Sequence, residues 1–263
     1  HGIRIRGRGF VEFAAPAKGR EKMSLERFSR TLSKALRNLP SWLPRATEEI
    51  NTIRFEDAPL ARFDFTIFPD RPRRSRVNAH VQGFGAQYHD VRYDAWEASA
   101  RLRGKQLTVN SLSLRQGDRR ADVTGKIDFQ ADTIEARAFT SLPPSSWMGL
   151  IPDPVRRKMA RTGFSFHGPI SCELWLGPAP LREAFEHFTG WLSLEKASLK
   201  NIWVERAFLS FQREGNYVDL VKVDAVIGKA AAKGHARGKV RFQVDTRQYW
   251  GEAEGSLDPK DLV

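Results

Sequence analysis

Hydrophobic and polar residues alternate with a period of two along most of the chain. Phe63, Phe65 and Ile67, for example, are separated by Asp64 and Thr66. This period is typical of a β-strand with one face buried and the other in water. Gly, Asp and Asn residues separate the short strands, which favours antiparallel meanders. The same alternation recurs at Ile170, Cys172, Leu174 and Leu176, at Val123, Ile127 and Phe129, and at Ala236, Val240 and Phe242.

The strand pattern occurs twice, which predicts an internal repeat. Gly104 aligns with Gly215, 111 positions later. Further along, the segment 124–130 matches 237–243 after a slip of two residues. The shared order and spacing of the matches carry the prediction, because their identities are few. Downstream of the glycines, Leu107 aligns with Val218, Val109 with Leu220, Leu112 with Val223, and Leu114 with Ala225.

The alignment divides the chain into three parts. Residues 1–23 look like the end of a preceding repeat, since Arg6–Phe13 resembles the last strand of a copy. Residues 24–147 form the first repeat unit, an amphipathic helix followed by a β-meander. Residues 148–263 form the second, with short helices and a β-meander. We therefore expect the chain to be a fragment of a longer repeat protein.

One irregularity recurs at the same place in both copies. The apolar residues change from odd-numbered to even-numbered positions between Val109 and Leu112, and from even to odd between Leu220 and Val223. We call this a switch of parity. A switch of parity within a strand predicts a β-bulge or a bend that redirects the following side chains. Its recurrence predicts a curved sheet in each unit.

Helix signals are few. Ser24–Leu39 carries an apolar stripe, with Ser24 as a cap and Pro40 at its end. We expect this helix to pack over the sheet, although a helix on a membrane surface is the alternative. Shorter helices are expected at Pro154–Ala160 and Leu181–Phe188. So few helices cannot cover the apolar face, so the sheet either closes into a sandwich or forms an open groove for an apolar guest.

Two stretches resemble the repeat of the AsmA-like family, which includes proteins of the YhdP and TamB type. They are Glu254–Leu262, and Leu107–Leu114 followed by Asp122–Phe129. The resemblance implies an elongated β-groove protein of the bacterial periplasm, anchored in the inner membrane by a segment outside this fragment. It also implies phospholipid transport and outer-membrane biogenesis. The Asp-Pro of the motif is Pro143-Pro144 in the first copy, so the motif is degenerate within this chain.

Composition adds constraints but no chemistry. The 43 Lys and Arg against 31 Asp and Glu give a net charge of +12. Such a charge either attracts phosphate of nucleic acids, lipid headgroups or lipopolysaccharide, or belongs to a solvated outer face, since the charges are spread along the chain. The 17 Phe and 7 Trp argue against disorder. Cys172 is the only cysteine, which excludes an intrachain disulfide and a cysteine-based metal site. The sequence has no run of 18 apolar residues, so it predicts no membrane-spanning helix.

No motif points to catalysis. The six histidines lack metal-ligand spacing, and Gly228–His235 lacks the end of a phosphate loop, so it is interpreted as a basic turn. His89, Asp90 and Asp94 are interpreted as a turn between strands rather than an acid–base pair. We therefore expect neither an enzyme nor a cofactor, and nucleic acid is disfavoured as a partner.

The leading hypothesis is a groove that binds acyl chains, since each buried CH₂ contributes about 0.8 kcal/mol. Its expected partners are phospholipid or another acyl lipid, neighbouring repeats and envelope proteins. The alternative is a non-catalytic structural or scaffolding module for envelope assembly. The predicted groove lining is Phe63, Phe65, Val109, Leu112, Leu114, Val123, Ile127 and Phe129 in the first copy, and Leu174, Val218, Leu220, Val223, Val240 and Phe242 in the second.

Overall fold

The computed structural model describes most of the chain between Ile5 and Ser256. The described residues are 5–12, 53–68, 71, 74–88, 91–147, 163–199, 202–228, 233–246 and 248–256. The helices expected at Ser24–Leu39 and Pro154–Ala160 lie outside these residues, as does the family motif beyond Ser256.

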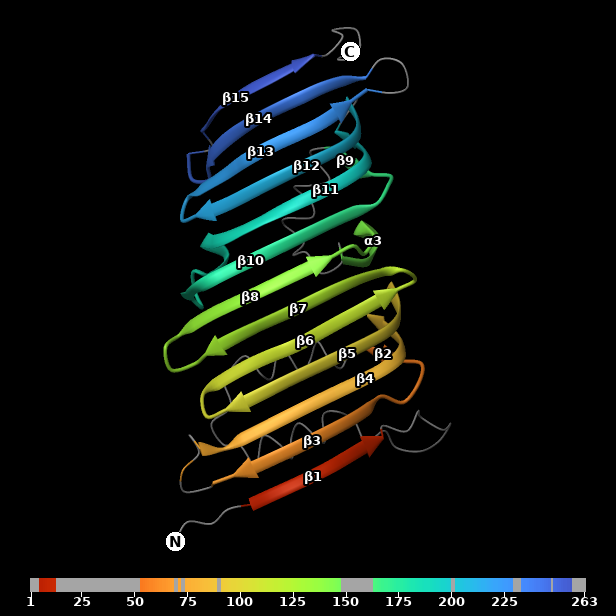
Figure 1. Cartoon of the computed structure of the whole chain (residues 1–263), viewed down its shortest axis with the longest axis vertical. Coiled ribbons are helices and arrows are strands. Elements are labelled where there is room, and N and C mark those ends of the chain that lie inside the picture. Colours follow the sequence, from red (N-terminus) through yellow and green to blue (C-terminus); the bar gives the residue numbers. More distant parts are fainter. Residues whose placement is uncertain are drawn as a thin grey trace. The chain divides into compact units, whose positions relative to one another are not determined.

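The described strands belong to one 15-stranded sheet, in which the strands pair antiparallel (Figure 1). The described helical segments are only a short α-helix, α3 (Pro144–Trp147), and a 3-10 turn, η3 (Ala184–Glu186). The predicted fold class, mainly β with antiparallel strands and few helices, is confirmed. The strands are β1 (Ile5–Glu12), β2 (Arg54–Phe55), β3 (Leu60–Ile67), β4 (Arg76–Tyr88), β5 (Val91–Arg103), β6 (Gln106–Gln116), β7 (Arg119–Asp128), β8 (Thr133–Thr140), β9 (Phe164–Phe166), β10 (Ile170–Pro180), β11 (His187–Leu199), β12 (Ile202–Glu214), β13 (Tyr217–Ile227), β14 (Gly234–Gln243) and β15 (Tyr249–Ser256).

The chain forms two compact units, which are described separately. The first contains His1–Gly104 and Ser111–Asp118, with the strand order β1-β3-β4-β5 and with β2 paired to β4. The second contains Lys105–Asn110 and Arg119–Val263, with the order β7-β8-β10-β11-β12-β13-β14-β15 and with β9 paired to β11. The division passes through β6. The repeat boundaries 24–147 and 148–263 rest on sequence similarity and stay a prediction.

Strand lengths recur from the first half of the chain to the second. Strands β4 to β8 have 13, 13, 11, 10 and 8 residues, and β11 to β15 have the same lengths in the same order. One long strand in each half also has an edge shared by two shorter ones. Strand β4 pairs with β3 and then with β2, and β11 pairs with β10 and then with β9.

The bulge predicted in the second copy is present in β13. Leu220 pairs with Val240 and Val223 with Gly238, so two residues of β13 lie opposite one residue of β14. On the other side of β13 the register shifts at the same place. The extra residue returns Val223 to the face on which Leu220 lies, which is why the sequence keeps apolar residues at both positions. The matching bulge in β6 stays a prediction.

The helix predicted at Leu181–Phe188 is wrong. Residues 181–183 form a turn, η3 spans three residues, and His187 already begins β11. The Leu181 amide donates a hydrogen bond to the Asp132 carbonyl at 2.9 Å, and His187 pairs with Glu214 of β12. Hydrogen bonding to neighbouring strands therefore outweighs the local helical pattern. In the part of the chain that the structure describes, no helix has the length and apolar character to span a bilayer.

Candidate functional site: the apolar face of the second unit

Cross-strand pairing in the second unit gathers small and apolar residues on one face of the sheet. Because directly paired residues point to the same face, the register defines four rows that run across the strands. We call these rows together the apolar face. The inner row is Ile170, Leu194, Ala207, Ala225, Ala236 and Gly255; the second is Ala121, Thr140, Cys172, Leu192, Leu209, Val223, Gly238 and Ala253; the third is Val123, Ala138, Leu174, Gly190, Phe211, Leu220, Val240 and Gly251; the outer is Gly125, Ala136, Leu176, Phe188, Arg213, Val218, Phe242 and Tyr249.

The inner row is the most buried part of this face in β10 to β13. Ile170 and Leu194 in the inner row are only 2% and 3% exposed, and they form a core with Ala197, Ala207 and Ala225. The larger side chains of the third and outer rows are half-buried in β10 to β14. The inner row therefore stabilises the fold, whereas the outer two rows keep apolar surface within reach of a ligand.

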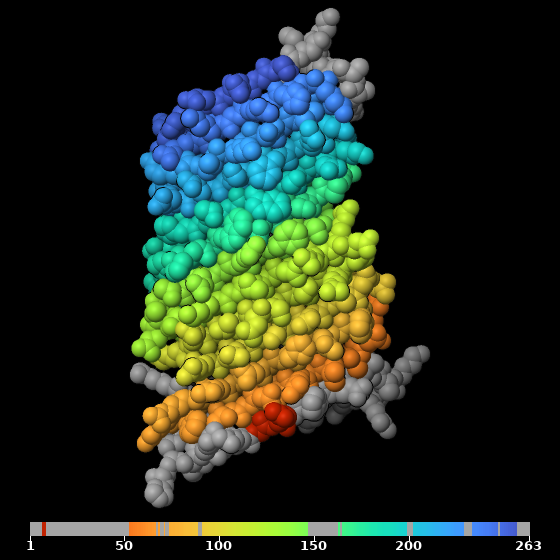
Figure 2. All heavy atoms as spheres, viewed as in Figure 1, coloured from red at the N-terminus to blue at the C-terminus, as the bar shows by residue number. Residues whose placement is uncertain are grey.

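Small residues allow large ones to lie flat on this face. A side chain on Gly190 would meet the ring of Phe211 at 2.8 Å, so that ring lies over the glycine. Phe188 contacts the same ring edge-to-face, with centroids 6.1 Å apart. Neighbouring strands also lie close to Gly125 and Gly238. A side chain added there would meet the carbonyl oxygen of Glu135 or of Glu252. Figure 2 shows the strands of this unit following one another in sequence order, from green to blue.

The predicted lining residues in β7, β10, β13 and β14 share one face. In β7, Val123 belongs to the third row, while Ile127 pairs with Ile134 just beyond the outer row. Phe129 follows β7 and is half-buried, and in the β6 segment Val109 is half-buried as well. Their role in lipid binding stays a prediction. The predicted residues that lie in the rows of β10, β13 and β14 are Leu174, Val218, Leu220, Val223, Val240 and Phe242.

The first unit has an apolar face of the same kind. Phe65 pairs with Val77, and Phe63 with Ala79. The Phe65 ring lies against Gly7, where a side chain would collide with it. In the β6 segment of this unit, Leu112 is 37% exposed and Leu114 is half-buried.

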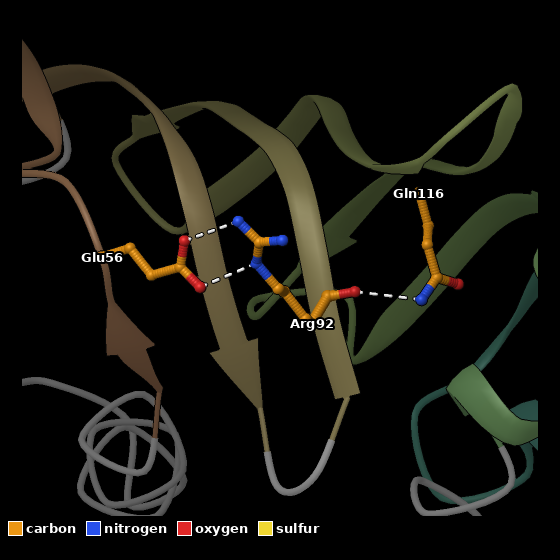
Figure 3. A network of polar contacts seen from close by, with 3 residues as sticks. All are labelled: Glu56, Arg92 and Gln116. Atoms are coloured by element: carbon orange, nitrogen blue, oxygen red, sulfur yellow. Dashed lines mark hydrogen bonds and ion pairs between the residues drawn. The ribbon is translucent and has the colours of Figure 1, made fainter.

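The opposite face carries charges that pair with one another. In the first unit, the Arg92 guanidinium donates to both carboxylate oxygens of Glu56 at 2.7 and 2.8 Å (Figure 3). This hydrogen bonding lowers the pKa of Glu56 below its ordinary value. The Gln116 amide donates to the Arg92 carbonyl at 3.0 Å, so three segments are joined. In the second unit, Arg241 binds Asp219 in the same bidentate way and lowers the pKa of that carboxyl group.

An aromatic cluster in the second unit also lies away from the apolar face. Its centre is Glu173, 8% exposed, which accepts hydrogen bonds from Arg137 and from the Trp191 indole at 3.0 Å. Trp191 stacks on Phe208 with centroids 6.2 Å apart. Because the charge of Glu173 is paired and hydrogen-bonded, this cluster has the character of a structural element.

Cys172 provides a chemical probe of the apolar face. It lies in the second row, between Thr140 and Leu192. Burial raises the pKa of its thiol, with a smaller contribution from the charge of Glu173. Less thiolate is therefore present near neutral pH than for an exposed cysteine. Among the described residues, no group of His, Cys, Asp or Glu side chains could hold a metal ion.

Sequence reasoning missed Arg213. It occupies the outer row between Phe188 and Val218, where the alternation of β12 continues from Ala207, Leu209 and Phe211. A charged residue in phase with an apolar alternation was the available signal. Its phase became meaningful only with the register of β12.

Comparisons with family models, curated proteins and solved structures found no match. The family resemblance of the sequence motifs therefore stays a proposal.

Proposed function

We propose that this chain binds acyl chains on its apolar face and serves as a segment of a lipid-transport groove of the AsmA-like type. Under this proposal it works in the bacterial periplasm, in outer-membrane biogenesis, and is anchored in the inner membrane by a segment outside the fragment. One observation carries the proposal: the register places small and apolar residues in four continuous rows, while the opposite face carries paired charges.

The dimensions of the face suit an extended hydrocarbon chain. Eight consecutive strands about 4.8 Å apart span about 34 Å across the second unit. Glycine and alanine separate the larger side chains, which provides shallow positions for methylene groups. Burial of about ten methylenes would contribute about 8 kcal/mol before the losses of motional freedom on binding. No specific headgroup contact is needed for such binding, which leaves the lipid free to move along the rows.

Protection of Cys172 tests the proposal directly. The delipidated chain is incubated at pH 8 with monoolein or a 1-oleoyl lysophospholipid, and the rate of maleimide attachment to Cys172 is measured. An acyl chain lying on the second and third rows should slow attachment at least fivefold. Native mass spectrometry should show the same lipid bound.

Two neighbouring residues provide matched variants. Val240 lies in the third row, paired with Leu220, whereas Lys239 is 65% exposed and paired with Glu252 at 3.1 Å. Val240→Asn places an amide among the apolar rows and should weaken lipid uptake at least fivefold. Lys239→Asn should leave uptake unchanged. Equal uptake by the two variants, or no change of the Cys172 rate with lipid, would exclude the apolar face as the binding surface.

A further inference from the structure

Arg213 is the one charged residue in the four rows of the apolar face. It lies in the outer row, paired with Phe188 on one side and Val218 on the other. Phe211, two residues earlier on the same strand, lies over Gly190 on this face. The register between β12 and β11 does not shift between Phe211 and Arg213. The two side chains therefore lie on the same face of β12.

The Arg213 side chain is half-buried, whereas most of the arginines that the structure describes are exposed. Its Nε donates a hydrogen bond to the Gly215 carbonyl at 3.0 Å, in a part-buried position. Within the described part of the chain it forms no ion pair with a carboxylate. Arg92 and Arg241, by contrast, each bind a carboxylate in bidentate geometry. The Gly215 contact fixes the guanidinium and leaves its two terminal nitrogens as donors.

The first copy shows that the fold does not require this charge. Leu102 stands 111 positions earlier, at the corresponding place near the end of the 13-residue strand β5. It pairs with Val77 of β4, as Arg213 pairs with Phe188 of β11. An apolar side chain therefore satisfies the packing at this position, and the arginine of the second copy needs another explanation.

We propose that Arg213 binds the phosphate of an acyl lipid whose hydrocarbon chain lies on the inner side of the outer row. This inference rests on the proposed function and adds a headgroup site to it. A half-buried guanidinium with two free terminal nitrogens matches a phosphate in charge and geometry. Its place at the edge of the rows, beside the turn at Gly215, keeps the headgroup near water while the acyl chain reaches the third row.

The test compares two lipids that share an oleoyl chain. Oleoyl lysophosphatidate carries a phosphate and monoolein does not. Both are titrated below their critical micelle concentrations into the delipidated chain by calorimetry. Arg213→Leu introduces the residue found at the corresponding position of the first copy. It should weaken binding of lysophosphatidate about tenfold, equal to about 1.4 kcal/mol, and leave monoolein binding unchanged.

Arg206→Leu is the matched control. Arg206 lies on the same strand, pairs with Glu195 and points to the opposite face, so this variant removes the same charge from the other side of the sheet. It should bind both lipids as the unmodified chain does. Arg213→Lys, which keeps the charge and loses the planar fork, should retain part of the preference for lysophosphatidate. Thermal unfolding of each variant verifies that it is folded.

The outcomes separate the headgroup site from the proposed function. If the unmodified chain binds both lipids and Arg213→Leu binds each of them as tightly as the unmodified chain does, the headgroup site is wrong and acyl binding stands. If Arg213→Leu loses both lipids to the same extent, Arg213 acts on packing and the headgroup site is again wrong. If the unmodified chain binds neither lipid, the proposed function fails as well. Inorganic phosphate at the same concentration should not compete, because the acyl chain provides most of the affinity.

Discussion

At the scale of single residues, glycine controls how closely the strands and their side chains approach. Gly190 is buried, with the Glu173 carbonyl on one side and the Phe211 ring on the other. A methyl group there would come within 2.5 Å of that carbonyl oxygen and 2.8 Å of the ring. Both distances are shorter than van der Waals contact, so the strands or the ring would have to shift. The absence of a side chain at Gly190 is thus part of the packing of the apolar face.

We predict that Gly190→Ala lowers the free energy of unfolding by about 1–3 kcal/mol, because overpacking forces backbone and ring displacement. Gly177→Ala is the control, since a side chain at the exposed Gly177 meets nothing within 4 Å. That change should stay within about 0.5 kcal/mol. Urea unfolding followed by tryptophan fluorescence measures both. Equal effects of the two substitutions would contradict the close packing at Gly190.

Asp219 provides a pH-dependent prediction. Hydrogen bonds from Arg241 lower the pKa of Asp219 below its ordinary value of 3.8. A lowered pKa in the folded state stabilises the fold above the ordinary value, and this contribution is lost as the pH falls toward the lowered pKa. Asp219→Asn should therefore be less stable than the unmodified chain at pH 7, with the difference shrinking below about pH 4.

Urea unfolding between pH 2.5 and pH 7 measures this difference. Asp224→Asn is the comparison, because the Asp224 carboxylate lies 3.7 Å from Arg237 in a looser ion pair. Its effect at pH 7 should be smaller than that of Asp219→Asn. Parallel pH profiles for the unmodified chain and Asp219→Asn would show that the bidentate pair does not contribute to stability.

At the scale of elements, each half of the chain interrupts one long strand at the same place. Gly85 in β4 and Lys196 in β11 are 111 positions apart and have φ values of 58° and 51°. The Gly85 carbonyl accepts from the Glu56 amide at 2.6 Å, and the Lys196 carbonyl from the His167 amide at 2.7 Å. The interruption lets Leu194 and Ala197 both contribute to the core despite their opposite parity.

The side chains around this interruption differ between the two copies. The first copy joins Glu56 and Arg92 by an ion pair, while the second stacks His167 on Trp203 with centroids 5.4 Å apart. These pairs also stand at corresponding positions, 111 residues apart. The backbone arrangement is therefore shared, and two different kinds of side-chain contact support it.

The strained backbone of Lys196 yields a prediction of stabilisation. A side chain in the left-handed region costs about 1 kcal/mol relative to glycine. Lys196→Gly should therefore raise the free energy of unfolding by up to about 1 kcal/mol. Gly85→Ala should lower it by about 1–2 kcal/mol, because the new methyl group is strained and meets the Glu56 side chain. Chemical denaturation of both variants measures the two effects, and a destabilised Lys196→Gly would refute the argument from strain.

At the scale of the whole molecule, the two faces of the sheet explain the proposed function. Each unit has a face of apolar rows and a face with paired charges, and in the second unit the latter also holds the aromatic cluster around Glu173. No second sheet lies among the described strands, because all of them belong to one sheet. The sheet is open, so the described strands do not close on themselves as the sandwich alternative required. An open sheet is the geometry that the groove hypothesis requires.

The sequence alone determined the strands, their antiparallel class and the bulge of β13. These features are local, because a period of two and its interruption can be recognised within a dozen residues. The predicted lining residues in β7, β10, β13 and β14 also fall on one face for this reason, since the parity of each strand was correct.

The tertiary structure decided what depends on pairing between distant segments. Whether Leu181–Phe188 became a helix was settled by hydrogen bonds to Asp132 and to β12. The burial of the inner row, the left-handed backbone of Lys196 and the position of Arg213 among apolar neighbours depend on contacts between strands. Register links residues far apart in sequence, so the alternation within β12 could show that Arg213 is in phase with Leu209 and Phe211 but not that it lies between Phe188 and Val218.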